Sequence, residues 1–107
     1  MQIHWRHPGE LEEALRTKSE QRIRALADGH SDLIDTWIDL EPSSGHHRLG
    51  DEHVTIHATV RGGQVVAHAG DAHLESALGR ALDKFSRNIW NLREKRSGRR
   101  HARNIEA

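Results

Sequence analysis

An apolar stripe of helical period across residues 74–92 is the feature that most restricts how this 107-residue chain can fold. The stripe covers about 100° of a helical wheel and consists of Leu74, Leu78, Ala81, Leu82, Phe85, Ile89 and Leu92. The opposite side spans about 80° by the same geometry and carries Arg80, Lys84, Arg87, Asn91 and Lys95. Such a helix must bury its apolar side against a second layer of structure. We expect the helix to end at Gly98.

Three segments of alternating sequence can supply that second layer. Residues 33–41, 53–60 and 64–69 alternate apolar with polar side chains, which is typical of strands with one buried and one solvent-facing side. In the first segment the inward side chains are expected to be Ile34, Thr36, Ile38 and Leu40. Gly62-Gly63 separates the last two segments and is the signal of a tight hairpin.

The N-terminal part adds a strand at residues 2–6 and a helix at residues 10–27. The helix has apolar side chains at helical spacing, namely Leu11, Leu15, Ile23 and Leu26. Lys18 and Ser19 interrupt this apolar side, so the middle of the helix should pack loosely.

Together these elements predict an α+β domain with the order β-α-β-β-β-α. Its two helices are expected to pack on one face of a four-stranded, mostly antiparallel sheet. Phe85 and Leu82 should lie at the centre of the core. We place the domain at residues 1–98 and expect a basic, flexible tail at residues 99–107.

Charge is polarised along the chain, although 16 basic and 16 acidic residues give a formal net charge of zero. Residues 73–107 carry nine basic and four acidic side chains, a formal charge of +5, and residues 1–72 carry −5. A neutral chain of this kind can still present a basic surface to RNA or another polyanion. The alternative is an ordinary solvated helix surface, whose charges are usually mixed. Here the acids stand only at the edges of the basic side, at Asp83 and Glu94.

Several functional classes are disfavoured. The absence of cysteine excludes disulfides and thiolate metal sites. We expect no enzyme, because the chain has neither a G-x-S-x-G motif nor a glycine-rich phosphate loop, and because Asp35 and Asp39 occupy ordinary outward strand positions. The ten histidines lack metal-ligand spacing, since His53 and His57 are four apart on a strand and His46-His47 lies in a loop. Scattered surface histidines, no metal, no cofactor and no small-molecule substrate are therefore expected.

Nothing in the sequence indicates a membrane or an export route. Residues 1–5 lack the charged-then-apolar pattern of a signal peptide. No apolar run approaches the roughly 18 residues that cross a bilayer. We expect a cytoplasmic protein.

The three tryptophans could stack on bases. Trp5 and Trp37 are expected on the open face of the sheet, and Trp90 at the border of the apolar stripe. Packing against the sheet is an equally simple role for these side chains, and the pattern does not decide between the two.

Several stretches, in order and separation, carry a resemblance over roughly residues 1–96: Met1-Gln2-Ile3, Leu11-Glu12-Glu13-Ala14-Leu15-Arg16, Val54-Thr55-Ile56-His57 with Gly62-Gly63, and Leu82-Asp83-Lys84-Phe85-Ser86-Arg87-Asn88-Ile89. With them the chain resembles the short form of the ribosome hibernation promoting factor family, also called ribosome-associated inhibitors, S30AE-type or sigma-54 modulation proteins. The resemblance implies a stress factor that sits in the decoding channel of the small ribosomal subunit and blocks translation by occupancy.

The same resemblance implies rRNA-facing roles for individual residues. The matching positions are Arg22, Lys84, Arg87 and Lys95, with Arg93 and Arg96 near the same helix end. Arg80 joins this set from the helical wheel alone. The chain departs from the family pattern at Ala25, where the family has a basic residue, and at Lys18-Ser19 and His73-Leu74-Glu75. The implied partners are the small ribosomal subunit and its rRNA, bound by a monomer.

Two other functions stay open. One is an RNA-binding module of the same fold that acts on a non-ribosomal RNA. The other is a protein-interaction domain that binds through its outward strand side, where Asp35, Asp39 and Glu41 lie.

Overall fold

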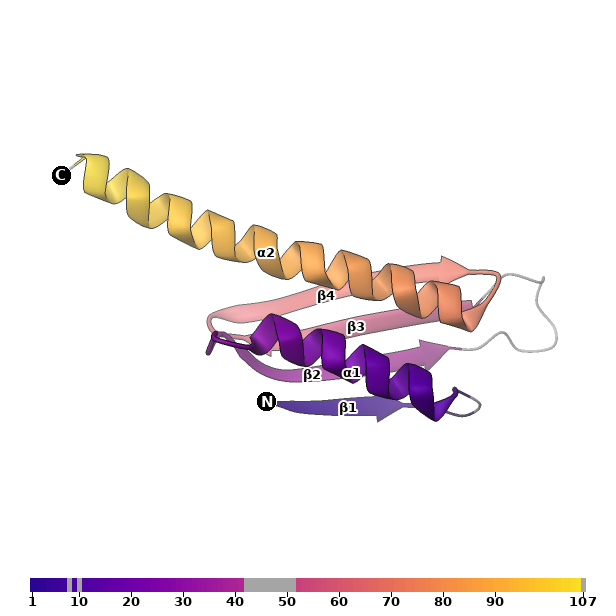
Figure 1. Cartoon of the computed structure of the whole chain (residues 1–107). Coiled ribbons are helices and arrows are strands. Elements are labelled where there is room, and N and C mark those ends of the chain that lie inside the picture. The colour runs from indigo at the N-terminus through magenta and orange to yellow at the C-terminus, as the bar shows by residue number, and fades with distance from the viewer. Residues whose placement is uncertain (8, 10, 42–51, 107) are drawn as a thin grey trace.

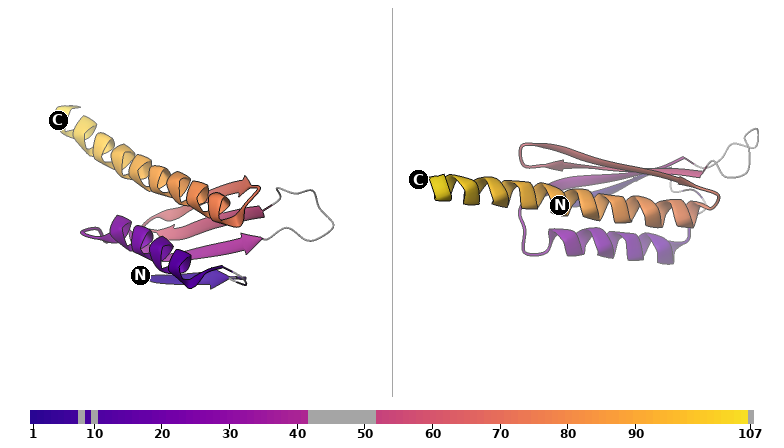
Figure 2. Two further views of the ribbon diagram at one scale, coloured as in Figure 1. Left: turned by 45° about the vertical axis from the view of Figure 1, so that its right-hand side comes forward. Right: turned by 90° about the horizontal axis from the view of Figure 1, so that it is seen from above.

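The expected order of elements and the α+β class are confirmed. The computed structural model describes residues 1–7, 9, 11–41 and 52–106, with side chains up to Arg96. In chain order the elements are β1 (Gln2–Arg6), α1 (Glu13–Ala27), β2 (Leu33–Glu41), β3 (Glu52–Val60), β4 (Gly63–Asp71) and α2 (Leu74–Glu106). The sheet has the order β1-β2-β3-β4, with β1 parallel to β2 and the other neighbours antiparallel. Both helices lie on one face of the sheet (Figures 1 and 2).

One core joins the apolar stripe of α2 to the covered face of the sheet. Phe85 is fully buried and Leu82 is 4% exposed, so their expected central place is confirmed. The same cluster includes the sheet residues Ile38, Leu40, Val54, Ile56, Ala58, Val65, Ala67 and Ala69. Alanines on both layers, such as Ala67 in β4 and Ala81 in α2, leave room for the helix to approach the sheet closely.

The strand register departs from simple alternation at two places. A bulge at the start of β2 keeps Leu33 in the core and turns Ile34 outward, where it is 46% exposed. The expectation that Ile34 faces inward is therefore wrong, because the extra residue reverses the alternation before it. In the hairpin, Val60 pairs with Gly63, so the two loop residues are Arg61 and Gly62, one position earlier than expected. Gly62 has φ 84°, which suits glycine.

The helix ends also differ from expectation. α1 begins at Glu13, and residue 10, like the loop at residues 42–51 with His46-His47, lies outside the described residues. α2 does not end at Gly98 but continues to Glu106 and extends past the sheet (Figure 1). A single interior glycine costs a helix only about 1 kcal/mol, and the arginines and alanine that follow favour helix. The division of the chain at residue 98 stays a prediction. No described helix is long and apolar enough to cross a bilayer.

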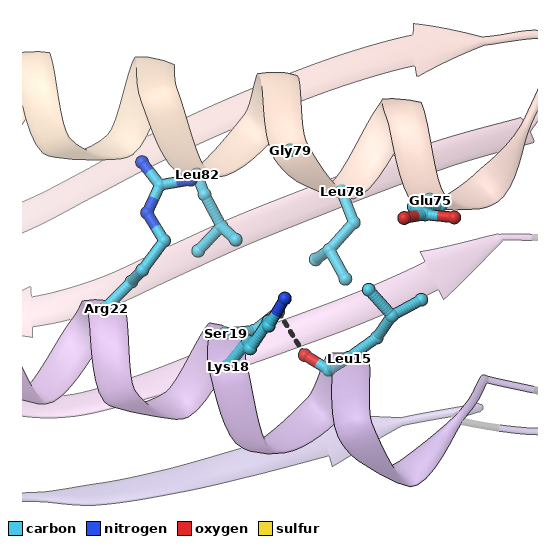
Figure 3. A pocket seen from close by; sticks show the side chains of 8 residues that line it. All are labelled: Leu15, Lys18, Ser19, Arg22, Glu75, Leu78, Gly79 and Leu82. Atoms are coloured by element: carbon cyan, nitrogen blue, oxygen red, sulfur yellow. Dashed lines mark hydrogen bonds between the residues drawn. The ribbon is translucent and has the colours of Figure 1, made fainter.

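α1 and α2 meet loosely around Ser19, as expected. Ser19 is only 3% exposed, and its Oγ donates a hydrogen bond to the carbonyl oxygen of Leu15 at 2.7 Å. Beside it a cleft of about 240 Å³ opens between the two helices, with Gly79 of α2 on the opposite wall (Figure 3). Two small residues thus face each other where larger ones would fill the groove.

A partly buried ion pair ties α2 to the connection between α1 and β2. Arg93 donates from Nε to Asp32 Oδ2 at 2.7 Å and from Nη2 to Asp32 Oδ1 at 2.9 Å. The same Nη2 donates to the carbonyl oxygen of Leu26 at 2.7 Å. The side chains of Arg93 and Asp32 are 11% and 18% exposed. The hydrogen bond from Arg93 is the largest cause of a lowered pKa at Asp32.

Replacing Asp32 by Asn should destabilise the fold by about 2–4 kcal/mol at pH 7, because a partly buried guanidinium loses its counter-ion. The folded pKa of Asp32 lies below its ordinary value of 3.8. Its contribution is therefore complete above pH 3.8 and is lost as the pH falls through the folded pKa. Urea unfolding should show the two proteins far apart at pH 7 and converging in acid. Asp83→Asn, in an exposed pair with Arg22, is the control and should change stability by less than about 1 kcal/mol.

Gly79→Ala should stabilise the protein by about 0.5–1 kcal/mol, the difference in helix propensity between the two residues. A Cβ at this position meets no atom within 4 Å. Gly70→Ala is the matched opposite, since its Cβ would lie 2.9 Å from the imidazole of His53. Thermal unfolding should move upward for the first variant and downward for the second. A destabilised Gly79→Ala would contradict the open space between the helices.

Candidate nucleic-acid interface

Four of the cations expected to bind RNA share the exposed side of α2. Arg80, Lys84, Arg87 and Lys95 are all exposed, and α2 runs along β4 (Figure 1). The row predicted by the helical wheel is present, but its members differ in what they contact. These contacts decide how available each cation is to a phosphate.

Lys84 is bound to the edge of the sheet. β4 is an outer strand, so some of its backbone groups have no neighbouring strand to pair with. Lys84 Nζ donates to the carbonyl oxygen of His68 at 3.0 Å, and Asn88 Nδ2 donates to that of Val66 at 3.1 Å. Side chains one helical turn apart on α2 thus reach carbonyl oxygens two residues apart on β4. These bonds protect the edge of the sheet from pairing with another chain.

Arg80 and Arg22 form exposed ion pairs. Arg80 Nη1 lies 3.2 Å from Asp71 Oδ2, at the end of β4. The pKa of Asp71 is lowered, first by the backbone N–H of Ala72 and also by Arg80. Arg22 Nη2 lies 2.8 Å from Asp83 Oδ1 and links α1 to α2. Exposed pairs of this kind contribute little to stability, because solvent and salt screen them.

Arg93 and Arg96 point into the protein's own structure. Arg93 is held by Asp32 and the carbonyl oxygen of Leu26, as described above. Arg96 Nη2 donates to the carbonyl oxygen of Arg61, in the hairpin loop between β3 and β4. The geometry of Arg93 favours a structural role, because a phosphate would have to displace a partly buried carboxylate.

Arg87 and Lys95 are the expected cations that have no hydrogen bond or ion pair within the described part of the chain. They are eight residues apart on α2, which corresponds to about 12 Å along the helix axis. Lys95 also lines a shallow cleft of about 290 Å³ with Gln64 and Asn91. The cleft is the next place along α2 and β4 at which a side chain could bond a strand carbonyl, as Lys84 and Asn88 do. Arg87 and Lys95 are therefore both free to contact a ligand.

The open face of the sheet carries stacked rings. Trp37 lies between His4 and His57, with ring centroids 5.2 Å and 4.9 Å apart. His53 stacks on His68, with centroids 5.1 Å apart. The expectation of scattered histidines is therefore wrong for these four, which the strand register places in two separate stacks, His4 and His57 on either side of Trp37 and His53 against His68. Their shared face could be recognised in the sequence only for His53 and His57. No group of three metal-binding side chains forms among the described residues.

The tryptophans divide between three environments. Trp37 lies on the open sheet face, as expected. Trp5 does not, because it pairs with the buried Ile38 and packs against the core, with the guanidinium of Arg16 5.5 Å from its ring. Trp90 is 50% exposed on α2.

The acidic strand side is present beside the stacked rings. Asp35 accepts a hydrogen bond from the backbone N–H of Gln2 at 3.0 Å. Asp39 has one buried carboxylate oxygen without a hydrogen-bond partner in the described structure. The rings and acids together make this face chemically distinct from the helix side, where the free cations lie.

The comparisons with known proteins agree with this architecture. The chain matches the family described as sigma 54 modulation protein / S30EA ribosomal protein over residues 1–97. None of the curated proteins is significantly similar to it in sequence. Its structure is similar to the N-terminal domain of Protein Y from Thermus thermophilus, with a TM-score of 0.64 and 20% identity over 85% of this chain and 94% of that one.

It is also similar to a ribosomal subunit interface protein from Coxiella burnetii, with a TM-score of 0.69 and 14% identity over 88% of this chain and 99% of that one. At such identities the structural likeness establishes the fold. The family match covers nearly the whole sequence, and the chain therefore belongs to the sigma 54 modulation protein / S30EA ribosomal protein family.

Proposed function

We propose that this protein binds the rRNA of the small ribosomal subunit in the decoding channel and blocks translation by occupying it. The family is one of ribosomal proteins, and the similar protein from Coxiella burnetii is named as a ribosomal subunit interface protein. The proposal needs no catalytic step and no cofactor. It places the protein in the cytoplasm, as a monomer that acts during stress.

The observation that carries the proposal is the pair of free cations on α2. Arg87 and Lys95 are exposed and have no partner among the described residues. Among the α2 cations whose side chains the structure describes, the others are paired with carboxylates or hydrogen-bonded to backbone carbonyls: Arg80, Lys84, Arg93 and Arg96. Two unpaired positive charges on a rigid helix favour a polyanion, because each phosphate contact releases condensed counterions.

The distribution of charge favours one orientation of docking. The part of the chain from residue 73 onward has a formal charge of +5, and the part before it has −5. Phosphates would repel the acidic side of the sheet, where Asp35 and Asp39 lie. The α2 side would therefore face the rRNA and the open sheet face would point away from it.

The elongated shape suits occupancy of a channel. The molecule measures 60 × 25 × 18 Å along its principal axes, and the long dimension follows α2 (Figure 1). A rod of this kind can exclude other ligands from a narrow space without recognising a base sequence. Contacts to phosphates position a protein but carry no sequence information.

Replacing Arg87 and Lys95 together by Gln should weaken binding to small subunits without unfolding the protein. Surface substitutions away from special features usually change stability by no more than about 0.5 kcal/mol. Affinity should fall, and the plot of log affinity against log salt should become less steep by about two units, one for each lost phosphate contact. Co-sedimentation with purified small subunits over a range of salt measures both, and translation in vitro should recover in parallel.

The matched control removes the same charge elsewhere. Arg6→Gln with Arg24→Gln takes one exposed cation from β1 and one from α1, where Arg24 Nη1 donates to the carbonyl oxygen of Met1 at 3.4 Å, and leaves α2 untouched. It should leave co-sedimentation and the salt slope unchanged. Lys84 is kept out of the test variant because its hydrogen bond to β4 is worth about 0.5–1.5 kcal/mol of stability.

Three results would overturn the proposal. If the folded Arg87/Lys95 variant still co-sediments and inhibits at wild-type concentration, the α2 surface is not the interface. If the protein is recovered with free RNA, the non-ribosomal alternative holds. If it associates with neither, the open sheet face with Asp35, Asp39 and Glu41 becomes the surface to test as a protein-binding site.

A further inference from the structure

We propose that Trp90 is a stacking platform for one unpaired base of the bound RNA, and that Arg87 holds the phosphate next to that base. This inference rests on the proposed RNA-binding function and adds a contact that distinguishes single-stranded from paired RNA. It concerns the side of α2 that borders the connection between α1 and β2.

The exposure of Trp90 needs an explanation. Trp90 is 50% exposed, whereas Trp5 and Trp37 are both partly buried. It lies beside the apolar stripe of α2, so it is not required to fill the core. About half of the indole therefore stays in water, on the same helix as the free cations.

The indole is held in place before any ligand arrives. The Cζ atom of Arg93 lies 5.0 Å from the centroid of the Trp90 ring, and Arg93 is itself fixed by Asp32. The ring of His30 meets that of Trp90 edge-on, at 5.9 Å and 90°. Binding to a ring that is already oriented loses little side-chain entropy. The exposed half of the indole is thus a ready surface.

The neighbouring charges fit a nucleotide with a definite orientation. Arg87 precedes Trp90 by three residues, so the two side chains are neighbours on the helix surface, and Arg87 has no partner within the described residues. The exposed acid Glu94 follows Trp90 by four residues, so Trp90 lies between Arg87 and Glu94 along the helix axis. A phosphate would be attracted toward Arg87 and repelled from Glu94, while the base covers the indole.

The chemistry points to an unpaired base. Every base has a π-face that can stack on an aromatic side chain, without dependence on sequence. In a duplex these faces are already covered by neighbouring base pairs, so only a single-stranded or bulged base can reach the indole. A protein partner would use the apolar area of Trp90 but would not require the adjacent cation.

Fluorescence anisotropy with two labelled probes at low salt tests this inference. The probes are a short single-stranded oligouridylate, whose bases stack little on one another, and a long RNA duplex, in which the two uncovered terminal pairs are a small share of the bases. Trp90→Ala should reduce affinity for the single strand by about 5- to 150-fold, the range for one base stacked on one aromatic ring, and should leave affinity for the duplex unchanged. Trp90→Phe should retain most of the single-strand affinity, whereas Trp90→Leu should lose as much as Trp90→Ala. Arg87→Gln should weaken binding of both probes.

The outcomes separate the inference from the function on which it rests. Equal losses for both probes, or none, would overturn the stacking role while small-subunit co-sedimentation still supports the proposed function. Full retention by Trp90→Leu would assign the indole to apolar contact with a protein and would also overturn it. If the wild-type protein does not co-sediment with small subunits, the proposed function itself is wrong. Circular dichroism and thermal unfolding establish that each variant is folded before it is compared.

Discussion

The packing of α2 against β4 is the constraint on which the rest of the structure depends. α2 contributes Phe85 and Ile89 to the core on one side and hydrogen-bonds the carbonyl oxygens of β4 through Lys84 and Asn88 on the other. Rotation of the helix about its axis would break one set of contacts or the other. The directions in which Arg87 and Trp90 point are therefore fixed by the fold and need no ligand to set them.

The fold could be predicted from the sequence wherever apolar side chains repeat with a clear period. The stripe that contains Phe85 and the alternation of β3 gave the right elements because burial dominates their energetics. The prediction that Ile34 faces inward is wrong because a β-bulge changes the backbone pairing, and the residue types at this position do not reveal it. Trp5 was misplaced because a five-residue edge strand is too short for its inward side to be certain until its register with Ile38 is known.

The candidate site was predictable only in part, for a different reason. A helical wheel shows which cations share a side of α2, but it cannot show their partners, which lie far away in the chain. Arg93 and Asp32 are 61 residues apart, as are Arg22 and Asp83. The histidine stacks on the open sheet face likewise depend on contacts between strands. Charge counted along the sequence therefore overstates how many cations are free.

The contacts of the cations rank them by the free energy needed to present each one to a phosphate. Arg87 and Lys95 need none, and the exposed pairs of Arg22 and Arg80 would cost little to exchange, because solvent screens them. Lys84 would give up a hydrogen bond worth about 0.5–1.5 kcal/mol.

Arg93 stands at the other end of this ranking, because separating it from Asp32 would cost about 2–4 kcal/mol, as for the loss of the carboxylate. A polyanion approaching α2 would therefore meet two cations at once and gain two more by exchange. It would leave Arg93 in place beneath Trp90. The residue that is least available to phosphate is thus the one that keeps the exposed indole oriented. The structural role of Arg93 and the proposed binding roles of Arg87 and Trp90 are therefore divided between neighbouring turns of a single helix.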